Sequence, residues 1–218
     1  MVAGTLNRLG ILCGPSEYGK STVLRGEVVD HLASHPRALA FVHDPHGEYV
    51  KTVKDRGICL EYESADAARE ALARNRRDLP RGFAIRGSSS AVRDLAMEIG
   101  KRHNRKDAVE VPIVQADDES SLIDSSSKTS ITKEDLDLVS NRRHYGIYKV
   151  LNVQSVRALT EAWFSNATDV WIYSQANEDD ARELERRLNL GKGRLLGSRI
   201  MNAPPFRFFH WRRGAGLL

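Results

Sequence analysis

The segment GPSEYGKS, residues 14–21, has residue types and spacing suited to binding phosphate. It fits the pattern G-x-x-x-x-G-K-[ST], in which the two glycines let the backbone wrap closely so that its N–H groups face phosphate oxygens. Lys20 would reach the β- and γ-phosphates of a nucleotide, and the Ser21 hydroxyl would bind Mg²⁺. An apolar run precedes the segment and a helical pattern follows it, which is the context that a phosphate loop requires. The predicted cofactors are ATP and Mg²⁺, and the predicted binding residues are Gly14, Pro15, Ser16, Glu17, Tyr18, Gly19, Lys20, Ser21 and Thr22. A glycine-rich turn is the alternative.

A phosphate loop needs an acid from another strand to position the metal, and VEVPIVQADDES, residues 109–120, offers one. Asp118 would hold Mg²⁺ through water, and Glu119 would polarise the attacking water. This pair predicts a hydrolase with glutamate as base rather than a kinase. Asp117 precedes the pair, so the register of the three acids stays open, and an acidic loop is the alternative.

The next apolar run, GIYKVLNVQ, ends in Gln154. A polar residue at the tip of a strand beside the acidic pair could contact the γ-phosphate or the attacking water. The alternative is a strand-end residue that faces solvent.

Apolar runs alternate with helical patterns along the whole chain. The predicted strands are 8–13, 37–44, 57–63, 82–87, 109–117, 146–154 and 169–175, and the predicted helices are 21–35, 66–78, 88–103 and 177–188. Such alternation predicts an α/β fold, a three-layer P-loop NTPase with a mostly parallel central sheet flanked by helices. Ligands of such sheets bind at the carboxyl ends of the strands. We expect one domain, residues 1–218, in which the Ser-rich segment 119–135 is a mobile loop.

The sequence FVHDPHGEY, residues 41–49, places two acids and a histidine where a predicted strand ends. In a parallel sheet this end lies on the ligand-binding edge, beside the phosphate loop. A surface turn is the alternative.

Taken in order, Gly14–Ser21, Asp44–Tyr49, Asp118–Glu119, the stretch NRRHYG at 141–146 and Gln154 resemble the HerA/FtsK superfamily of P-loop motor ATPases. Within it, the chain is similar to the genome-packaging ATPases of tailless, internal-membrane viruses. The resemblance implies that Glu48 or His46 supports the nucleotide site or a subunit contact. It also implies a homo-oligomeric ring, expected to be a hexamer, in which Arg142 or Arg143 stabilises the transferred phosphoryl group on a neighbouring subunit.

The partners implied by this resemblance are double-stranded DNA, pumped into a procapsid, and capsid or viral membrane proteins. A net charge of +4 permits a polyanionic partner without requiring one. Basic clusters at 101–106, 141–144 and 206–213 could grip phosphates or form solvated faces. The candidate grips are Lys101, Arg102, Arg105, Lys106, Arg207, Arg212 and Arg213. Phe206 could serve a base-binding pocket or belong to the core.

The 218 residues contain no apolar run near the ~20 residues that a membrane helix needs, and no signal peptide is visible. Cys13 and Cys59 have no metal-like spacing, so we expect reduced thiols and a cytoplasmic location, in a host cell or at a virion vertex. The alternatives are a HerA/FtsK-like cellular or filamentous-phage assembly ATPase and a P-loop nucleotide kinase. A small GTPase is a further alternative.

Overall fold

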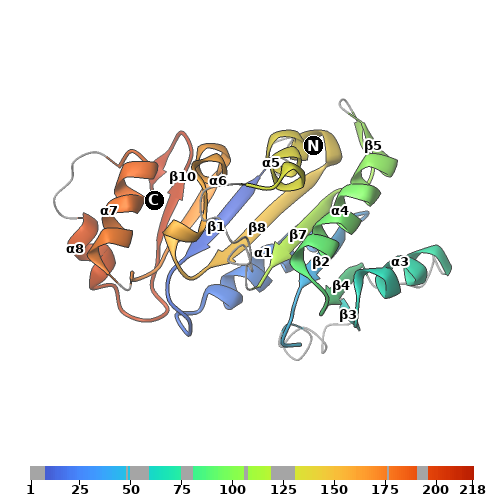
Figure 1. The fold of residues 1–218 in the computed structure, drawn as a ribbon, viewed down its shortest axis with the longest axis horizontal. Coiled ribbons are helices and arrows are strands. Elements are labelled where there is room, and N and C mark those ends of the chain that lie inside the picture. The colour runs from blue at the N-terminus through green and yellow to red at the C-terminus, as the bar shows by residue number, and fades with distance from the viewer. Residues whose placement is uncertain are drawn as a thin grey trace.

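The computed structural model describes residues 8–47, 49, 59–74, 81–105, 108–118, 131–175, 177–190 and 196–218. Its main feature is one nine-stranded sheet in the order β11-β10-β9-β1-β8-β7-β2-β4-β3 (Figure 1). The strands are β1 (Leu9–Cys13), β2 (Leu39–His43), β3 (Cys59–Tyr62), β4 (Gly82–Ile85), β7 (Ile113–Asp117), β8 (Ile147–Val153), β9 (Asp169–Ile172), β10 (Phe209–Arg212) and β11 (Gly216–Leu217). From β9 to β3 every pairing is parallel, whereas β10 runs antiparallel to β9 and to β11.

The helices are α1 (Lys20–Ser34), α3 (Ala65–Arg74), α4 (Ser89–His103), α5 (Lys133–Tyr145), α6 (Glu161–Asn166), α7 (Glu178–Arg187) and α8 (Leu196–Met201), with a short 3₁₀ turn η3 (Val156–Ala158). A small hairpin, β5 (Asn104–Arg105) and β6 (Ala108–Val109), follows α4. Side chains that accept backbone N–H bonds begin several of the helices, such as Ser88 before α4 and Thr132 before α5. Within the described ranges, each helix is too short or too polar to cross a lipid bilayer.

Alternation along the strands sorts the core into layers on either side of the sheet. Leu12, Val42, Val114 and Val150 pack with α1 in one cluster. Their neighbours in sequence pack on the opposite face, which α4, α5, α6 and α7 cover (Figure 1). The architecture is therefore helix, sheet, helix, as predicted.

The continuous apolar runs gave the strands of the parallel sheet correctly, and β7 begins at Ile113, directly after Pro112. The predicted mobile loop 119–135 is wrong at its end, because residues 133–135 form the first turn of α5 and Asp135 is buried. Residues 119–130 lie outside the described residues. The predicted reduced state of the two cysteines is consistent with the structure, in which Cys13 and Cys59 are buried and free of disulfides.

The C-terminal basic cluster, predicted as a DNA grip, contains β10, the strand next to the edge strand β11. Residues 209–212 pair with β9 over Ile172 to Asp169. Arg212 donates to the carboxylate of Asp169 at 2.9 Å, and the Arg213 guanidinium donates to backbone carbonyls of residues 164, 165 and 167. Two of the three proposed C-terminal grips are therefore bonded within the fold.

Candidate nucleotide-binding site

The phosphate loop, residues 14–19, connects the end of β1 to the start of α1. Gly14 has φ +153°, and a Cβ atom there would lie 2.6 Å from Tyr173 Cβ. Gly19 has φ +88°, and a Cβ atom there would lie 2.7 Å from a ring carbon of Phe206. Both positions favour glycine because their φ is positive, and at Gly14 the neighbouring backbone and Tyr173 also fill the space that a side chain would take.

Lys20 is the first residue of α1 and is only 5% exposed. Its ammonium donates to the carbonyl of Gly14 at 2.6 Å and to the carbonyl of Pro15. Burial lowers the pKa of Lys20 to about 8, although the charge of Asp118 opposes the shift. A phosphate in the loop would supply the negative charge that this buried cation lacks.

Asp118 comes directly after β7 and meets the end of the phosphate loop. Its Oδ1 atom accepts hydrogen bonds from the Ser21 hydroxyl at 2.6 Å and from the Asn152 side-chain amide at 3.0 Å. The hydroxyl and the carboxylate are oxygen ligands of the kind that Mg²⁺ prefers, and phosphates and water usually complete its shell. The donor set therefore fits a Mg²⁺ ion.

Asp117, its neighbour in sequence, points to the opposite face of the sheet. There its carboxylate forms a buried ion pair with Lys149 and accepts a hydrogen bond from Gln115 at 2.8 Å. The period of two in a strand explains this split. Of these two adjacent acids, Asp118 is thus the one that contacts the end of the phosphate loop, and Asp117 belongs to the core.

A cleft of about 510 Å³ opens over the loop. Gln154, exposed just beyond β8, lines it, as predicted from its position at a strand end, and so do Arg25, Asp44 and His46. The Asp44 carboxylate accepts a hydrogen bond from the backbone N–H of Tyr49 at 2.9 Å, and this bond links Asp44, just after β2, to Tyr49. The full set of described lining residues is Ser16, Glu17, Gly19, Lys20, Ser21, Thr22, Arg25, Asp44, His46, Asp118, Asn152, Val153, Gln154, Ala158 and Phe206. Two predicted site residues, Glu48 and Glu119, lie outside the described residues.

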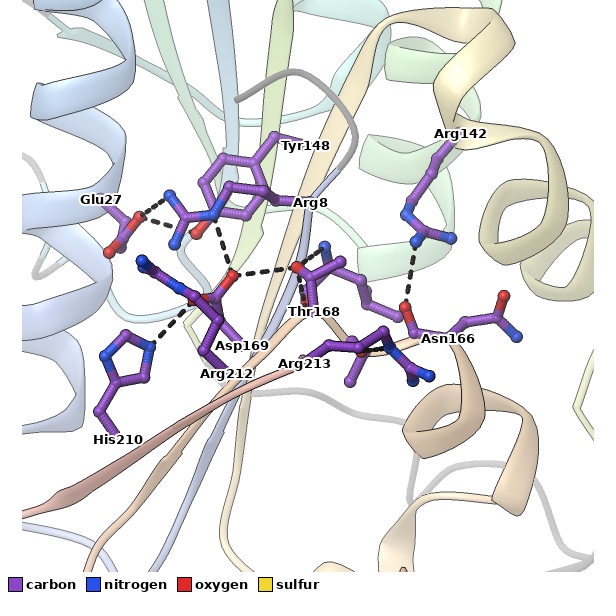
Figure 2. Close-up of polar contacts among 12 residues, drawn as sticks. Arg8, Glu27, Arg142, Tyr148, Asn166, Thr168, Asp169, His210, Arg212 and Arg213 are labelled. Carbon is purple, nitrogen blue, oxygen red and sulfur yellow. Dashed lines mark hydrogen bonds and ion pairs between the residues drawn. The ribbon is translucent and has the colours of Figure 1, made fainter. Parts of the chain in front are cut away.

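The structure does not bring Arg142 or Arg143 into this cleft. Arg142 lies near the end of α5 and donates to the backbone carbonyls of Val139 and, at 3.0 Å, Asn166 (Figure 2). Burial lowers the pKa of Arg142 to about 10, and the nearby charges of Arg213 and Arg143 add to the shift. Its side chain is engaged in holding α5 to α6, which argues against the predicted arginine finger at this residue. Arg143 is exposed, and its role in a neighbouring subunit stays a prediction.

Three residues after Asn166, the carboxylate of Asp169 accepts hydrogen bonds from several elements (Figure 2). It accepts from Arg8 at 3.0 Å, from Arg212 at 2.9 Å and from Thr168 at 3.0 Å, and the His210 ring lies at 3.0 Å. Burial alone would raise the pKa of Asp169, but the bonds from Arg8, Arg212 and Thr168 lower it below its ordinary value. This cluster anchors β10 to the sheet.

Sequence reasoning missed Asn152 and Arg25 and left Phe206 undecided. Asn152 could have been predicted, because it stands two positions before Gln154 and residues two apart in a strand lie on the same face. Arg25 stands four residues after Ser21 and so shares its helix face. The position of Phe206 depends on contacts distant in sequence, which no local pattern reveals.

Solved structures with a similar fold were found. The genome-packaging NTPase B204 of Sulfolobus turreted icosahedral virus 2, in complex with AMPPCP, matches with a TM-score of 0.70 and 14% identity, over 97% of this chain and 95% of that chain. B204 of Sulfolobus turreted icosahedral virus, a DNA-packaging ATPase, matches with a TM-score of 0.66 and 12% identity, over 96% and 94% of the two chains. This chain shares the fold of these packaging enzymes. The cytoplasmic domain of the type VII secretion ATPase EccC from Thermomonospora curvata matches with a TM-score of 0.58 and 15% identity, over 98% of this chain but 23% of that one. Neither a protein-family model nor a curated protein sequence matches the chain.

Proposed function

We propose that this chain is a Mg²⁺-dependent ATPase that couples hydrolysis to the movement of double-stranded DNA, as a viral genome-packaging motor. The observation that carries the ATPase part is the 2.6 Å contact between Ser21 and Asp118, two residues 97 positions apart. It joins the end of a phosphate loop to an acidic strand end on the ligand-binding edge of the sheet, which is the arrangement that P-loop hydrolysis needs.

Each residue at the cleft has a role in this proposal. Backbone N–H groups of the loop and Lys20 would hold the β- and γ-phosphates. Ser21 and Asp118 would hold Mg²⁺, which when bound neutralises charge on the phosphate oxygens. Asn152 would fix the Asp118 carboxylate, and Gln154 would contact the γ-phosphate or the attacking water. Glu119, the next residue after Asp118, is proposed as the general base.

The DNA-motor part is supported by the shared fold with B204, which extends over nearly the whole of both chains. In this proposal the chain works as a homo-oligomeric ring, a hexamer as the resemblance to superfamily motors implies, with Arg143 reaching a neighbouring subunit. Capsid or viral membrane proteins would dock the ring, in the host cytoplasm or at a virion vertex.

The test is ATP turnover with and without long double-stranded DNA, at low and at moderate salt. We expect DNA to stimulate turnover and salt to weaken the stimulation, because phosphate contacts release counterions. Lys20→Ala is the control and should abolish turnover under every condition. Turnover that persists in Lys20→Ala would reject the phosphate loop, and turnover indifferent to DNA at low salt would reject the DNA motor.

A second candidate is an ATPase of the secretion or assembly type, which the likeness to EccC favours. In that case Lys20→Ala would still abolish turnover, but DNA would leave the rate unchanged. The same experiment therefore separates the two functions.

A further inference from the structure

Phe206 occupies a turn position that a bulky side chain rarely takes. The backbone N–H of Arg207 donates to the carbonyl of Pro204 at 3.2 Å, which closes a four-residue turn. Pro205 stands second in this turn, and Phe206 stands third with φ +61°. A proline followed by a positive φ is the pattern of a type II turn, whose third position normally requires glycine or asparagine. Strain of this kind is often retained where it serves a site.

The strained position places the aromatic ring against the phosphate loop. Three ring carbons lie 2.7, 3.4 and 3.7 Å from the point where a Cβ atom of Gly19 would stand, so the ring lies on the backbone just before Lys20. The side chain nevertheless stays 69% exposed and lines the cleft. Among the described residues, Phe206 belongs to none of the hydrophobic clusters, whereas nearby Phe209 packs against one of them. Core packing therefore does not explain it.

The chemistry of the cleft identifies what the exposed ring would meet. Most of the described lining residues are polar or charged, including Lys20, Asp118 and Gln154, and Phe206 is the one Phe, Tyr or Trp residue among them. A nucleotide whose phosphates fill the loop would place its base, which has flat π-faces, elsewhere in the same cleft. Aromatic rings bind bases by stacking, which is tolerant of base identity because every base has a π-face.

We propose that Phe206 is the stacking platform for the nucleobase. The inference rests on the proposed nucleotide binding and adds to it the residue that holds the base. Because stacking discriminates poorly among purines, the platform should support ATP and GTP alike. The binding of inorganic tripolyphosphate, which has no base, should not depend on the Phe206 ring.

The experiment is calorimetric binding of ATP, GTP and tripolyphosphate, each with Mg²⁺, to the full chain and its variants. We expect Phe206→Ala to weaken ATP and GTP about tenfold and to leave tripolyphosphate unchanged, in line with the measured range for losing one stacked base. Phe206→Trp should restore nucleotide binding. Phe206→Gly relieves the positive φ but removes the ring, so it should be as weak as Phe206→Ala.

The matched control is Phe208→Ala, an exposed aromatic two residues away whose ring contacts Tyr173 and does not line the cleft. It should change neither nucleotide nor tripolyphosphate binding. If wild type bound both ATP and tripolyphosphate but Phe206→Ala bound ATP equally well, the platform would be refuted and the phosphate loop would stand. Equal losses for ATP and tripolyphosphate, or recovery in Phe206→Gly, would show that the turn and not the ring matters. If wild type bound neither ligand, the proposed function itself would fail, and the platform with it.

Discussion

Breaking the buried ion pair between Asp117 and Lys149 should destabilise the protein strongly. Both residues are 2% exposed, and they lie on adjacent strands β7 and β8 beneath α4 and α5. Burial lowers the pKa of Lys149, while Asp117 opposes this shift through its charge and a hydrogen bond. Lys149→Met keeps the length of the side chain but leaves the Asp117 carboxylate buried without its cation.

The size of the effect follows from this burial. Removing one partner of a buried pair costs about 3–5 kcal/mol, chiefly because the other charge stays desolvated. For 218 residues the entropy of unfolding is about 0.46 kcal/mol/K, so the expected fall in Tm is about 7–11 °C. Adding Asp117→Asn removes the orphaned charge and keeps an oxygen to accept the hydrogen bond from Gln115. The double variant should therefore recover most of the lost stability.

Urea unfolding of the wild type, both single variants and the double variant measures the free energies directly. Arg74→Met is the control, because Arg74 pairs with Glu70 on the surface and is 79% exposed. Arg74→Met should lower the free energy of unfolding by less than about 0.5 kcal/mol. A loss below about 1 kcal/mol in Lys149→Met, or a double variant as unstable as the sum of the two single variants, would refute the buried pair.

Four further predictions concern the cleft and its surroundings. Glu119→Gln should keep ATP binding but lose hydrolysis, as measured by single-turnover kinetics; normal turnover would reject Glu119 as the base. Asn152→Leu should raise the Mg²⁺ concentration for half-maximal turnover about tenfold to a hundredfold, because Asp118 loses the amide that orients it, and an unchanged Mg²⁺ titration would contradict this role. ATP binding should weaken as pH rises through about 8, because the free protein then loses the Lys20 proton and ATP binding must restore it. Calorimetry in buffers of different ionisation enthalpy should therefore show that ATP binding takes up a proton at pH 9 but little at pH 6.5. Arg142→Ala should lower the free energy of unfolding by about 1–3 kcal/mol, because two hydrogen bonds to backbone carbonyls are lost. Turnover per folded molecule should stay unchanged. A large loss of turnover without a loss of stability would instead support Arg142 as the arginine finger.

The parallel sheet was predictable because its strands are buried on both faces and read as continuous apolar runs. The phosphate loop was predictable because its glycines and Lys20 lie within one short segment, so that their spacing in the sequence identifies the loop. Helix α5 was missed because only Asp135, Leu138 and Val139 of its residues are buried, too few for an apolar stripe. Its capping residue, Thr132, and the acids Glu134 and Asp135 in its first turn were the local signals of a helix start.

The acidic triplet shows what a strand pattern can and cannot decide. Alternation alone predicts that Asp117 and Asp118 face opposite sides of the sheet. Which side holds the phosphate loop depends on the placement of α1, and this depends on packing across the whole sheet. The contact of Asp118 with Ser21, and of Asp117 with Lys149, supplies that missing information.

The basic clusters differ in how readily they could contact a polyanion, and their existing partners explain why. Arg212 bonds to a buried carboxylate and Arg213 to backbone carbonyls, so releasing either would leave polar groups of the fold unpaired. Lys101 and Arg102, at the end of α4, pair instead with Asp137 and Glu98 on the surface, where an ion pair contributes little. A phosphate could replace those carboxylates at small cost. Among these candidates, the surface at the end of α4 is therefore freer to contact a polyanion than β10, although the sequence offered residues 101–106 and 206–213 alike.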